Sequence, residues 1–495
     1  MSKLKKVDSI VIVGGGSSAW ITAALLSHTV PHLHITIIDK ENGAPLGVGE
    51  GTLLSFDKIM NRCGFLIDEW FFEIDATAKS GILFPGWGEN QETVWHPFEF
   101  NKIPGFDTTQ LNLWSKNQTY DFKKYGLSMY DVSIEHDAVD TSTLGSYAFH
   151  IDAVKLVNFI QKKLSNRPNI TQIRSDVISI ERDSDNNITK LHLKNNEIIT
   201  SDLYIDCTGF KQLLAHTPER VNLDGRLFCD TAIAGHVPYE NKEDEMHPFV
   251  VSEQVEHGWV WNIPVQSRIG SGLVFSRSCT DIETAKEAFC EYWHHRVKKE
   301  NLKVIDWTPY YNKNQWHENV VSIGLSAGFL EPLESTGLAL SITGAEQLAF
   351  VLESRFYSDN TVKYFNIVME GYFDDSIDFV SMHYDSPTRA GKLWDLVREK
   401  WQKSEKQQMY ETIIQQSDVP LPISGSGYVF SASNWICWLT QLGKPVGQGN
   451  DGLSKEQAEF ELIKYYEFEI SRSARSIHHT KYIDMLKQRV LNDKV

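Results

Sequence analysis

The chain has 495 residues, enough for two or three lobes instead of one compact core. Its 48 lysines and arginines against 65 aspartates and glutamates give a net charge of −17, so we expect no nucleic-acid partner. No stretch approaches the roughly 18 apolar residues of a membrane span. The six cysteines form no C-x-x-C pair. We therefore expect a cytoplasmic protein with reduced thiols, no membrane partner and no metal site.

The first predicted elements, within residues 9–40, are a strand, a tight turn, a helix and a second strand. Gly14 and Gly16 form the turn, and Ala19 takes the place of the third glycine in a G-x-G-x-x-G/A pattern. Asp39 lies at the end of the second strand, where this fold places the acid that binds a ribose hydroxyl. The pattern favours a dinucleotide site at a helix N-terminus over an ordinary βαβ turn, which remains the alternative.

The next elements alternate between helical and strand patterns. A glycine-spaced loop, GVGEGT, begins at Gly47 and precedes a helical pattern, and the polar, aromatic stretch 101–140 predicts loops or a lid. Apolar spacing predicts a helix over 151–164 and then a β-meander over 176–206. From Leu338 onward the pattern is mainly helical to the C-terminus, with a break near residues 420–425. The lobes should therefore be interleaved along the chain.

Several short stretches together carry a family resemblance. They read GGGSSAW from Gly14, GVGEGT, AKSGI around Lys79, WVWNIP from Trp259, GLSAGF from Gly324, and EPLESTG from Glu331. This combination resembles the flavin-dependent halogenases of the tryptophan halogenase family. The resemblance extends from the first strand to about Gly344, with weaker similarity as far as Trp435. It implies an α/β, FAD-binding two-dinucleotide-fold flavoprotein of the single-component monooxygenase type, with a mainly helical C-terminal region.

The resemblance implies an enzyme that uses reduced FAD, oxygen and a halide ion to make hypohalous acid for a separate aromatic substrate. Lys79 matches the family lysine, which either donates a hydrogen bond to the acid or forms a haloamine. Glu334 matches a carboxylate that orients the halogen donor and takes up the ring proton, with Ser335 assisting. The structural alternatives are a lysine on a solvated helix face and an ordinary ion-pair partner for Glu334.

Other positions match cofactor and halide contacts of the family. Thr336 and Gly337 match backbone amides that hold halide beside the flavin, although Ser335 or Thr336 could equally be a simple helix N-cap. The FAD-binding residues implied are Gly14, Gly16, Ser17, Ala19, Asp39, Lys40, Glu50, Val177, Leu325 and Leu338. Flavin hydroxylases commonly have Asp at the Leu325 position, so its absence favours a halogenase.

The aromatic positions concern substrate. Trp259 and Trp261 match a paired motif thought to keep organic substrate away from the flavin, and their spacing of two places both on one face of a strand. Core packing explains the two tryptophans equally well. His96 and Phe98 match an H-P-F segment that sandwiches the aromatic ring, with Trp435 facing it. We find no Tyr-Glu-Phe cluster of the kind that clamps free tryptophan, so indoles, phenols and other electron-rich rings stay open.

The resemblance also implies partners. No second dinucleotide fingerprint is visible, so we expect a separate flavin reductase to supply reduced FAD in trans, and a homodimer is the assembly considered. The rivals are a flavin-dependent aromatic hydroxylase or related FAD oxidoreductase, and a non-catalytic flavoprotein. The predicted regions are an FAD-binding lobe made of three segments (residues 1–100, 146–240 and 311–345), a lid and substrate region (101–145), a substrate-lobe sheet (241–310) and a helical substrate lobe (346–495).

Overall fold

The computed structural model describes residues 4–40, 47–98, 131–133, 147–215, 219–385, 389–416, 429–444, 460 and 476–492. The chain forms two compact units, each built from three separate stretches. Unit 1 comprises Met1–Asp75, Ile151–Leu223 and Trp307–Asp374, and unit 2 comprises Ala76–His150, Asp224–Asp306 and Asp375–Val495. The first predicted segment of the FAD-binding lobe therefore divides between the units after Asp75. Apart from residues 131–133, the predicted lid lies outside the described residues.

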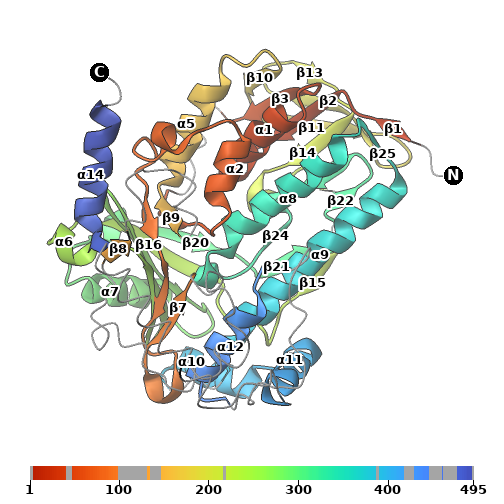
Figure 1. Cartoon of the computed structure of the whole chain (residues 1–495). Helices are drawn as coiled ribbons and strands as arrows, with labels where there is room; N and C mark the ends of the chain where they lie inside the picture. Colours follow the sequence, from red (N-terminus) through yellow and green to blue (C-terminus); the bar gives the residue numbers. More distant parts are fainter. Residues whose placement is uncertain are drawn as a thin grey trace. The chain divides into compact units, whose positions relative to one another are not determined.

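Unit 1 is organised around a six-stranded sheet (Figure 1). In spatial order its strands are β10 (Ile170–Arg174), β3 (His34–Asp39), β2 (Ser9–Val13), β14 (Leu203–Asp206), β23 (Val320–Ser322) and β22 (Trp316–His317). All neighbours pair in parallel except β22 and β23. The central strands are continuous apolar runs, as strands of a parallel sheet covered on both faces must be. Their carboxyl ends therefore share one edge.

Helices and small sheets complete unit 1. The helix α1 packs against α5 and α8 and is almost entirely buried (Figure 1). The helices are α1 (Ser17–Thr29), α2 (Phe56–Arg62), α3 (Ile67–Trp70), α5 (Ala153–Leu164), α8 (Thr336–Leu352) and the N-terminal half of α9 (Asp359–Met382). The first three strands of the predicted meander are confirmed as β11 (Val177–Arg182), β12 (Ile188–Leu193) and β13 (Ile198–Ile199), whereas its last predicted strand is β14 of the six-stranded sheet. The remaining strands are β1 (Lys5–Lys6), β4 (Glu50–Gly51), β15 (Arg220–Asn222), β21 (Tyr310–Asn312), β24 (Gly328–Phe329) and β25 (Phe356–Tyr357).

Unit 2 contains a seven-stranded sheet that is antiparallel except where β17 meets β6. In spatial order its strands are β20 (Lys303–Asp306), β16 (Thr231–Val237), β19 (Arg268–Phe275), β18 (Gly258–Val265), β17 (Val250–Val255), β6 (Gly81–Phe84) and β7 (Val94–Pro97). Phe289 of α7 (Ile282–Tyr292) packs into the same core as Val260 and Leu273 of the sheet. Shorter strands are β5 (Thr77–Lys79), β8 (Asp131–Ser133), β9 (Ala148–Ile151) and β26 (Ser476–His478).

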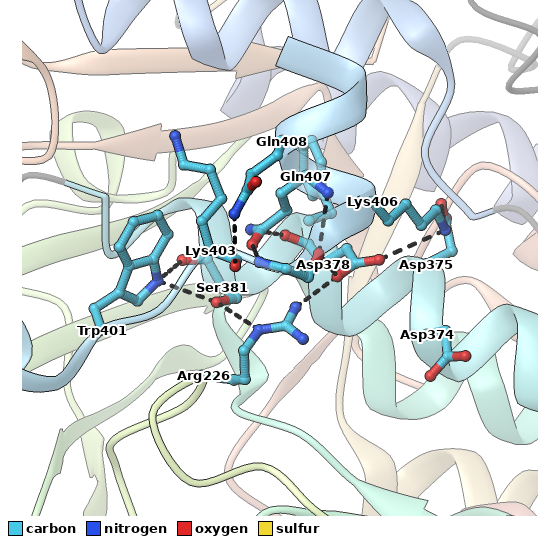
Figure 2. Close-up of polar contacts among 12 residues, drawn as sticks. Arg226, Asp374, Asp375, Asp378, Ser381, Trp401, Lys403, Lys406, Gln407 and Gln408 are labelled. Atoms are coloured by element: carbon cyan, nitrogen blue, oxygen red, sulfur yellow. Dashed lines mark hydrogen bonds and ion pairs between the residues drawn. The ribbon is translucent and has the colours of Figure 1, made fainter. Parts of the chain in front are cut away.

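The later helices of unit 2 are joined to α9 by a buried polar network (Figure 2). Asp378 accepts hydrogen bonds from Arg226 Nη2 at 2.6 Å and from Ser404 Oγ at 2.8 Å. Lys406 Nζ lies 3.6 Å from Asp375 Oδ1 and 3.7 Å from Asp378 Oδ2. The remaining helices of this unit are α6 (Lys242–Glu245), α10 (Lys392–Lys400), α11 (Glu405–Gln416), α12 (Ala432–Gln441) and α14 (His479–Asn492). Across the described ranges, no helix is long and apolar enough to cross a membrane.

Candidate functional site

The glycine turn between β2 and α1 has a closely packed backbone. Gly14 has a φ of +138°, and a Cβ there would lie 2.2 Å from the Cys207 carbonyl oxygen. A Cβ on Gly15 would lie 1.8 Å from a carboxylate oxygen of Asp39. Gly16, the N-cap of α1, differs because a Cβ there would meet no described atom within 4 Å. The turn is thus packed on its strand side and open at the helix N-terminus, as a pyrophosphate site requires.

Acidic and basic side chains lie beside this turn at the carboxyl edge of the sheet. Asp39 is buried at the end of β3, and burial raises the pKa of its carboxyl group. The exposed Lys40 follows, and its contact with Lys211 lowers the pKa of the Lys211 ammonium. Ser175 N donates to Asp39 O at 2.9 Å, which places Val177 just beyond the neighbouring strand end. This edge of the sheet therefore provides a carboxyl group, that of Asp39, for a ribose hydroxyl, and two adjacent lysines, Lys40 and Lys211, for phosphate.

Glu50 lies in the two-residue strand β4 and is partly buried. Burial raises its pKa to about 7, and the carboxylate of Asp152 adds to that rise. Asp152 is itself held as the N-cap of α5 because it accepts hydrogen bonds from Val154 N at 2.9 Å and Lys155 N at 3.0 Å. Glu50 consequently changes protonation near neutral pH and can either accept a hydrogen bond from a cofactor hydroxyl or donate one.

A fully buried carboxylate fixes the turns that follow β14 and β23. Asp206 accepts hydrogen bonds from Thr208 Oγ1 at 2.7 Å, Leu214 N at 2.7 Å and Ser326 Oγ at 2.9 Å. Ser326 closes the 3₁₀ turn Gly324–Ser326, which carries Leu325. Asp206 thus holds the Leu325 turn against the end of the central strand.

The E-P-L-E-S-T-G stretch forms a tight corner that leads into α8. Glu334 is 1% exposed and ends a 3₁₀ turn. Ser335 has a left-handed backbone with φ +59°, an uncommon conformation for a residue other than glycine and one that clusters at functional sites. Its hydroxyl makes no capping hydrogen bond, so the N-terminus of α8 is not capped by the Ser335 side chain. Thr336 and Gly337 begin α8 without an acidic residue in the first turn, which leaves that helix end suited to an anion.

These residues of unit 1 fit an FAD molecule. The open space at Gly16 and the N-terminus of α1 suit the pyrophosphate, and the buried Asp39 suits the ribose. Leu325 lies in the 3₁₀ turn at the carboxyl edge and Leu338 in the first turn of α8, which contacts that 3₁₀ turn, so both can supply apolar surface for a ring system. The fit to FAD therefore rests on the open space at Gly16 together with the carboxyl group of Asp39, and not on the glycine pattern alone.

In unit 2, Lys79 ends the strand β5 and is 0% exposed. Lysine is almost never so deeply buried unless it has a partner or a function. Its Nζ lies 5.0 Å from the centre of the Phe98 ring, which is held nearby because Phe98 N donates to Ser80 O at 2.9 Å. The structure therefore brings Lys79 and Phe98 together, and the solvated-helix alternative for Lys79 is not observed.

The backbone beside Lys79 is held by a histidine from the far end of the chain. His479 Nε2 accepts a hydrogen bond from Ala78 N at 3.1 Å, and its Nδ1 donates to the Met246 carbonyl oxygen at 2.8 Å. Burial lowers the pKa of His479 to about 4. The ring stays neutral at working pH, so the C-terminal helix α14 contributes a fixed support for β5.

The two tryptophans of W-x-W-x-I-P lie on one face of β18, as their spacing predicts. Their ring centres are 6.3 Å apart, and Trp259 and Trp261 are 0% and 7% exposed. A Cβ on Gly272 of β19 would lie 2.1 Å from the Trp261 ring, so the ring packs directly on that backbone. At least Trp261 therefore has a packing role within the sheet.

His96 and Trp435 meet in an aromatic cluster of unit 2. His96 is 1% exposed, and its Nε2 lies 2.9 Å from Asn434 Nδ2. Both the His96 and Trp435 rings lie 5.5 Å from the ring centre of Phe379, and Trp435 also contacts Tyr410 at 5.1 Å. The structure thus brings two of the three predicted substrate residues, His96 and Trp435, to the ring of Phe379, with both side chains buried.

Comparison with known proteins gives the family of this chain. The family model described as tryptophan halogenase matches residues 9–455. The chain belongs to the tryptophan halogenase family. Its predicted family, its α/β FAD-binding fold and its class as a flavin-dependent halogenase enzyme are confirmed.

Relatives of this halogenase span most of its length. It is 29% identical to the tryptophan 7-halogenase RebH of Lentzea aerocolonigenes, over 79% of this chain and 78% of that protein. It is 26% identical to the tryptophan 6-halogenase ThaL of Streptomyces albogriseolus, over 85% of each. The crystal structure of a tryptophan halogenase from Shewanella frigidimarina aligns with a TM-score of 0.85 and 25% identity, over 98% of both chains.

Three residues of this halogenase that surround the candidate groups did not emerge from the sequence. Asp206 was visible only as the end of a strand, before Cys-Thr-Gly. His150 lies in a short strand that carries no recognisable motif, and His479 lies 401 positions beyond Ala78 of the lysine segment. A buried strand ending in Asp before a glycine turn was the one available signal, because it marks a carboxyl edge.

Proposed function

We propose that this halogenase uses reduced FAD, oxygen and halide to make hypohalous acid, and that Lys79 directs the acid to an electron-rich aromatic ring. The observation that carries the proposal is the complete burial of Lys79 beside the Phe98 ring. The neutral hypohalous acid, which has one O–H group, is held there by the Lys79 ammonium, a buried donor that few other molecules can reach. Bound reduced FAD supplies the electrons that activate oxygen.

The residues of unit 1 have separate tasks in this proposal. Amides at the start of α8, from Thr336 and Gly337, hold the halide, since a helix N-terminus favours an anion. Glu334 takes up the proton that the ring loses on substitution, with Ser335 assisting. FAD is held by Gly14, Gly16, Ser17, Ala19, Asp39, Lys40, Glu50, Val177, Leu325 and Leu338.

For the substrate we propose an indole-like or phenolic ring. The relatives RebH and ThaL are named for action on tryptophan, which makes an indole the first compound to try. The buried rings around Phe379 supply aromatic surface in the region of His96, and the half-buried Phe98 supplies a ring beside Lys79.

The test is a panel of electron-rich arenes incubated with FAD, NADH, a flavin reductase and each halide, with products read by mass. A halogenase should give a halogen mass shift that requires halide. An aromatic hydroxylase would give oxygenated product without halide, and a non-catalytic flavoprotein would give neither. Omitting the reductase tests the proposed need for that separate partner, and rapid turnover without it would contradict that aspect of the proposal.

A further inference from the structure

His150 and Lys79 share one face of the β5–β9 pair in unit 2. In the antiparallel register Thr77 lies opposite His150, and Lys79 lies opposite Ala148. Side chains two residues apart point the same way, so all four lie on one face and His150 is the diagonal neighbour of Lys79. Ala148, with a single methyl group, leaves the space between His150 and Lys79 free of a bulky β9 side chain.

The hydrogen bonds of Thr77 determine which nitrogen of His150 carries the proton. Thr77 Oγ1 lies 2.6 Å from the Pro264 carbonyl oxygen and 2.8 Å from His150 Nδ1. A carbonyl only accepts, so it takes the one hydroxyl proton, and Nδ1 must be the N–H that donates to Oγ1. The Nε2 atom of His150 is then a bare acceptor.

That acceptor is buried without a partner. His150 is 0% exposed, and its Nε2 has no hydrogen-bond partner among the described residues. A buried acceptor left unpaired costs about 1–3 kcal/mol, so it calls for an explanation. The neighbouring His479 differs, because both of its ring nitrogens are engaged by backbone groups.

The titratable groups acting on His150 from the surrounding elements are Lys79, His479 and His247. Burial lowers the pKa of His150 well below its ordinary value, and these three groups lower it further. His479 and His247 are themselves neutral at working pH, since burial lowers the pKa of each to about 4. His150 therefore stays a neutral acceptor. Of the three groups that act on it, Lys79 is the one that carries a positive charge.

We propose that His150 is a positioning residue for Lys79, whose ammonium donates to His150 Nε2 through one water molecule. This inference rests on the proposed function, because it assigns His150 a role in aiming the lysine. A neutral acceptor also keeps the proton on Lys79, which favours hydrogen bonding over haloamine formation.

Two variants separate this role from packing. His150→Asn keeps a donor at the Nδ1 position for Thr77 but removes the Nε2 acceptor, whereas His150→Gln places an amide oxygen near the Nε2 position. A hydrogen bond to the charged form raises the pKa of an amine, so losing it should lower the pKa of Lys79. His150→Asn should therefore reduce halogenated product by about 10²-fold and move the alkaline limb of product formation to lower pH, with flavin oxidation unchanged. His150→Gln should restore both to an intermediate level.

The outcomes are distinguishable. If wild-type protein gives no halogenated product with any arene, the proposed function fails. If wild type halogenates but His150→Asn keeps its rate and its alkaline limb, this inference fails alone. ¹⁵N resonances of the His150 ring decide the matter without a His150 variant: Nε2 should shift when Lys79→Met removes the donor, and an unchanged resonance would overturn the inference even if both variants misfold.

Discussion

Replacing Glu50 with glutamine should stabilise the FAD-free protein at neutral pH but not in acid. The environment raises the pKa of Glu50 from 4.5 to about 7. Between these values the folded protein keeps a proton that the unfolded chain has released, so the free energy of unfolding falls as pH rises. The full difference corresponds to about 3 kcal/mol, an upper bound because Glu50 is partly exposed to water. Glutamine cannot ionise and should not show this loss.

Urea unfolding of wild type and Glu50→Gln at pH 4.5 and 7.5 measures the effect. The two proteins should unfold at similar urea concentrations at the lower pH and diverge at the higher one, with the variant more stable. Glu73→Gln is a matched control on the surface, where Glu73 pairs with Lys162 at 3.1 Å, and its effect should stay below about 1 kcal/mol. Parallel pH profiles for wild type and Glu50→Gln would refute the raised pKa.

Two further substitutions test the packing of unit 2. Asp378→Asn removes the charge that Arg226 contacts and should lower the free energy of unfolding in urea by about 2–3 kcal/mol. The control Glu283→Gln breaks an exposed ion pair and should lower it by less than about 1 kcal/mol. Equal losses of stability in the two variants would contradict the importance of the buried network. Gly272→Ala places a methyl group against the Trp261 ring and should cost about 1–3 kcal/mol with a change in tryptophan fluorescence; an unchanged melting temperature would show that the ring moves freely.

The dinucleotide unit could be predicted from sequence because its signals are local. The strand, the glycine turn, the helix and the acid at Asp39 all lie within residues 9–40, and each follows from periodicity or backbone freedom. The structure has the same elements at β2, α1 and β3. The first three strands of the meander after Asp176 were equally local and were also confirmed.

The surroundings of Lys79 could not be predicted in the same way. Its burial depends on a three-residue strand whose partner, β9, lies about 70 residues later in the chain. The bond from Ala78 to His479 joins residues 401 positions apart. Pairings of such sequence separation leave no periodic pattern, so resemblance supplied Lys79 while its burial and its neighbour His150 came only from the structure.

The most direct test of the central claim measures three quantities in Lys79→Ala: flavin oxidation, halide consumption and halogenated product. In the proposed function, oxidant forms beside the FAD-binding residues and the transfer step occurs at Lys79. Flavin oxidation and halide consumption should therefore stay near wild-type rates while halogenated product disappears. Lys79→Arg should retain partial activity if the side chain acts only by hydrogen bonding, and none if it must form a haloamine, because guanidinium stays protonated. Wild-type halogenation by Lys79→Ala, with the same ring position substituted, would contradict the account.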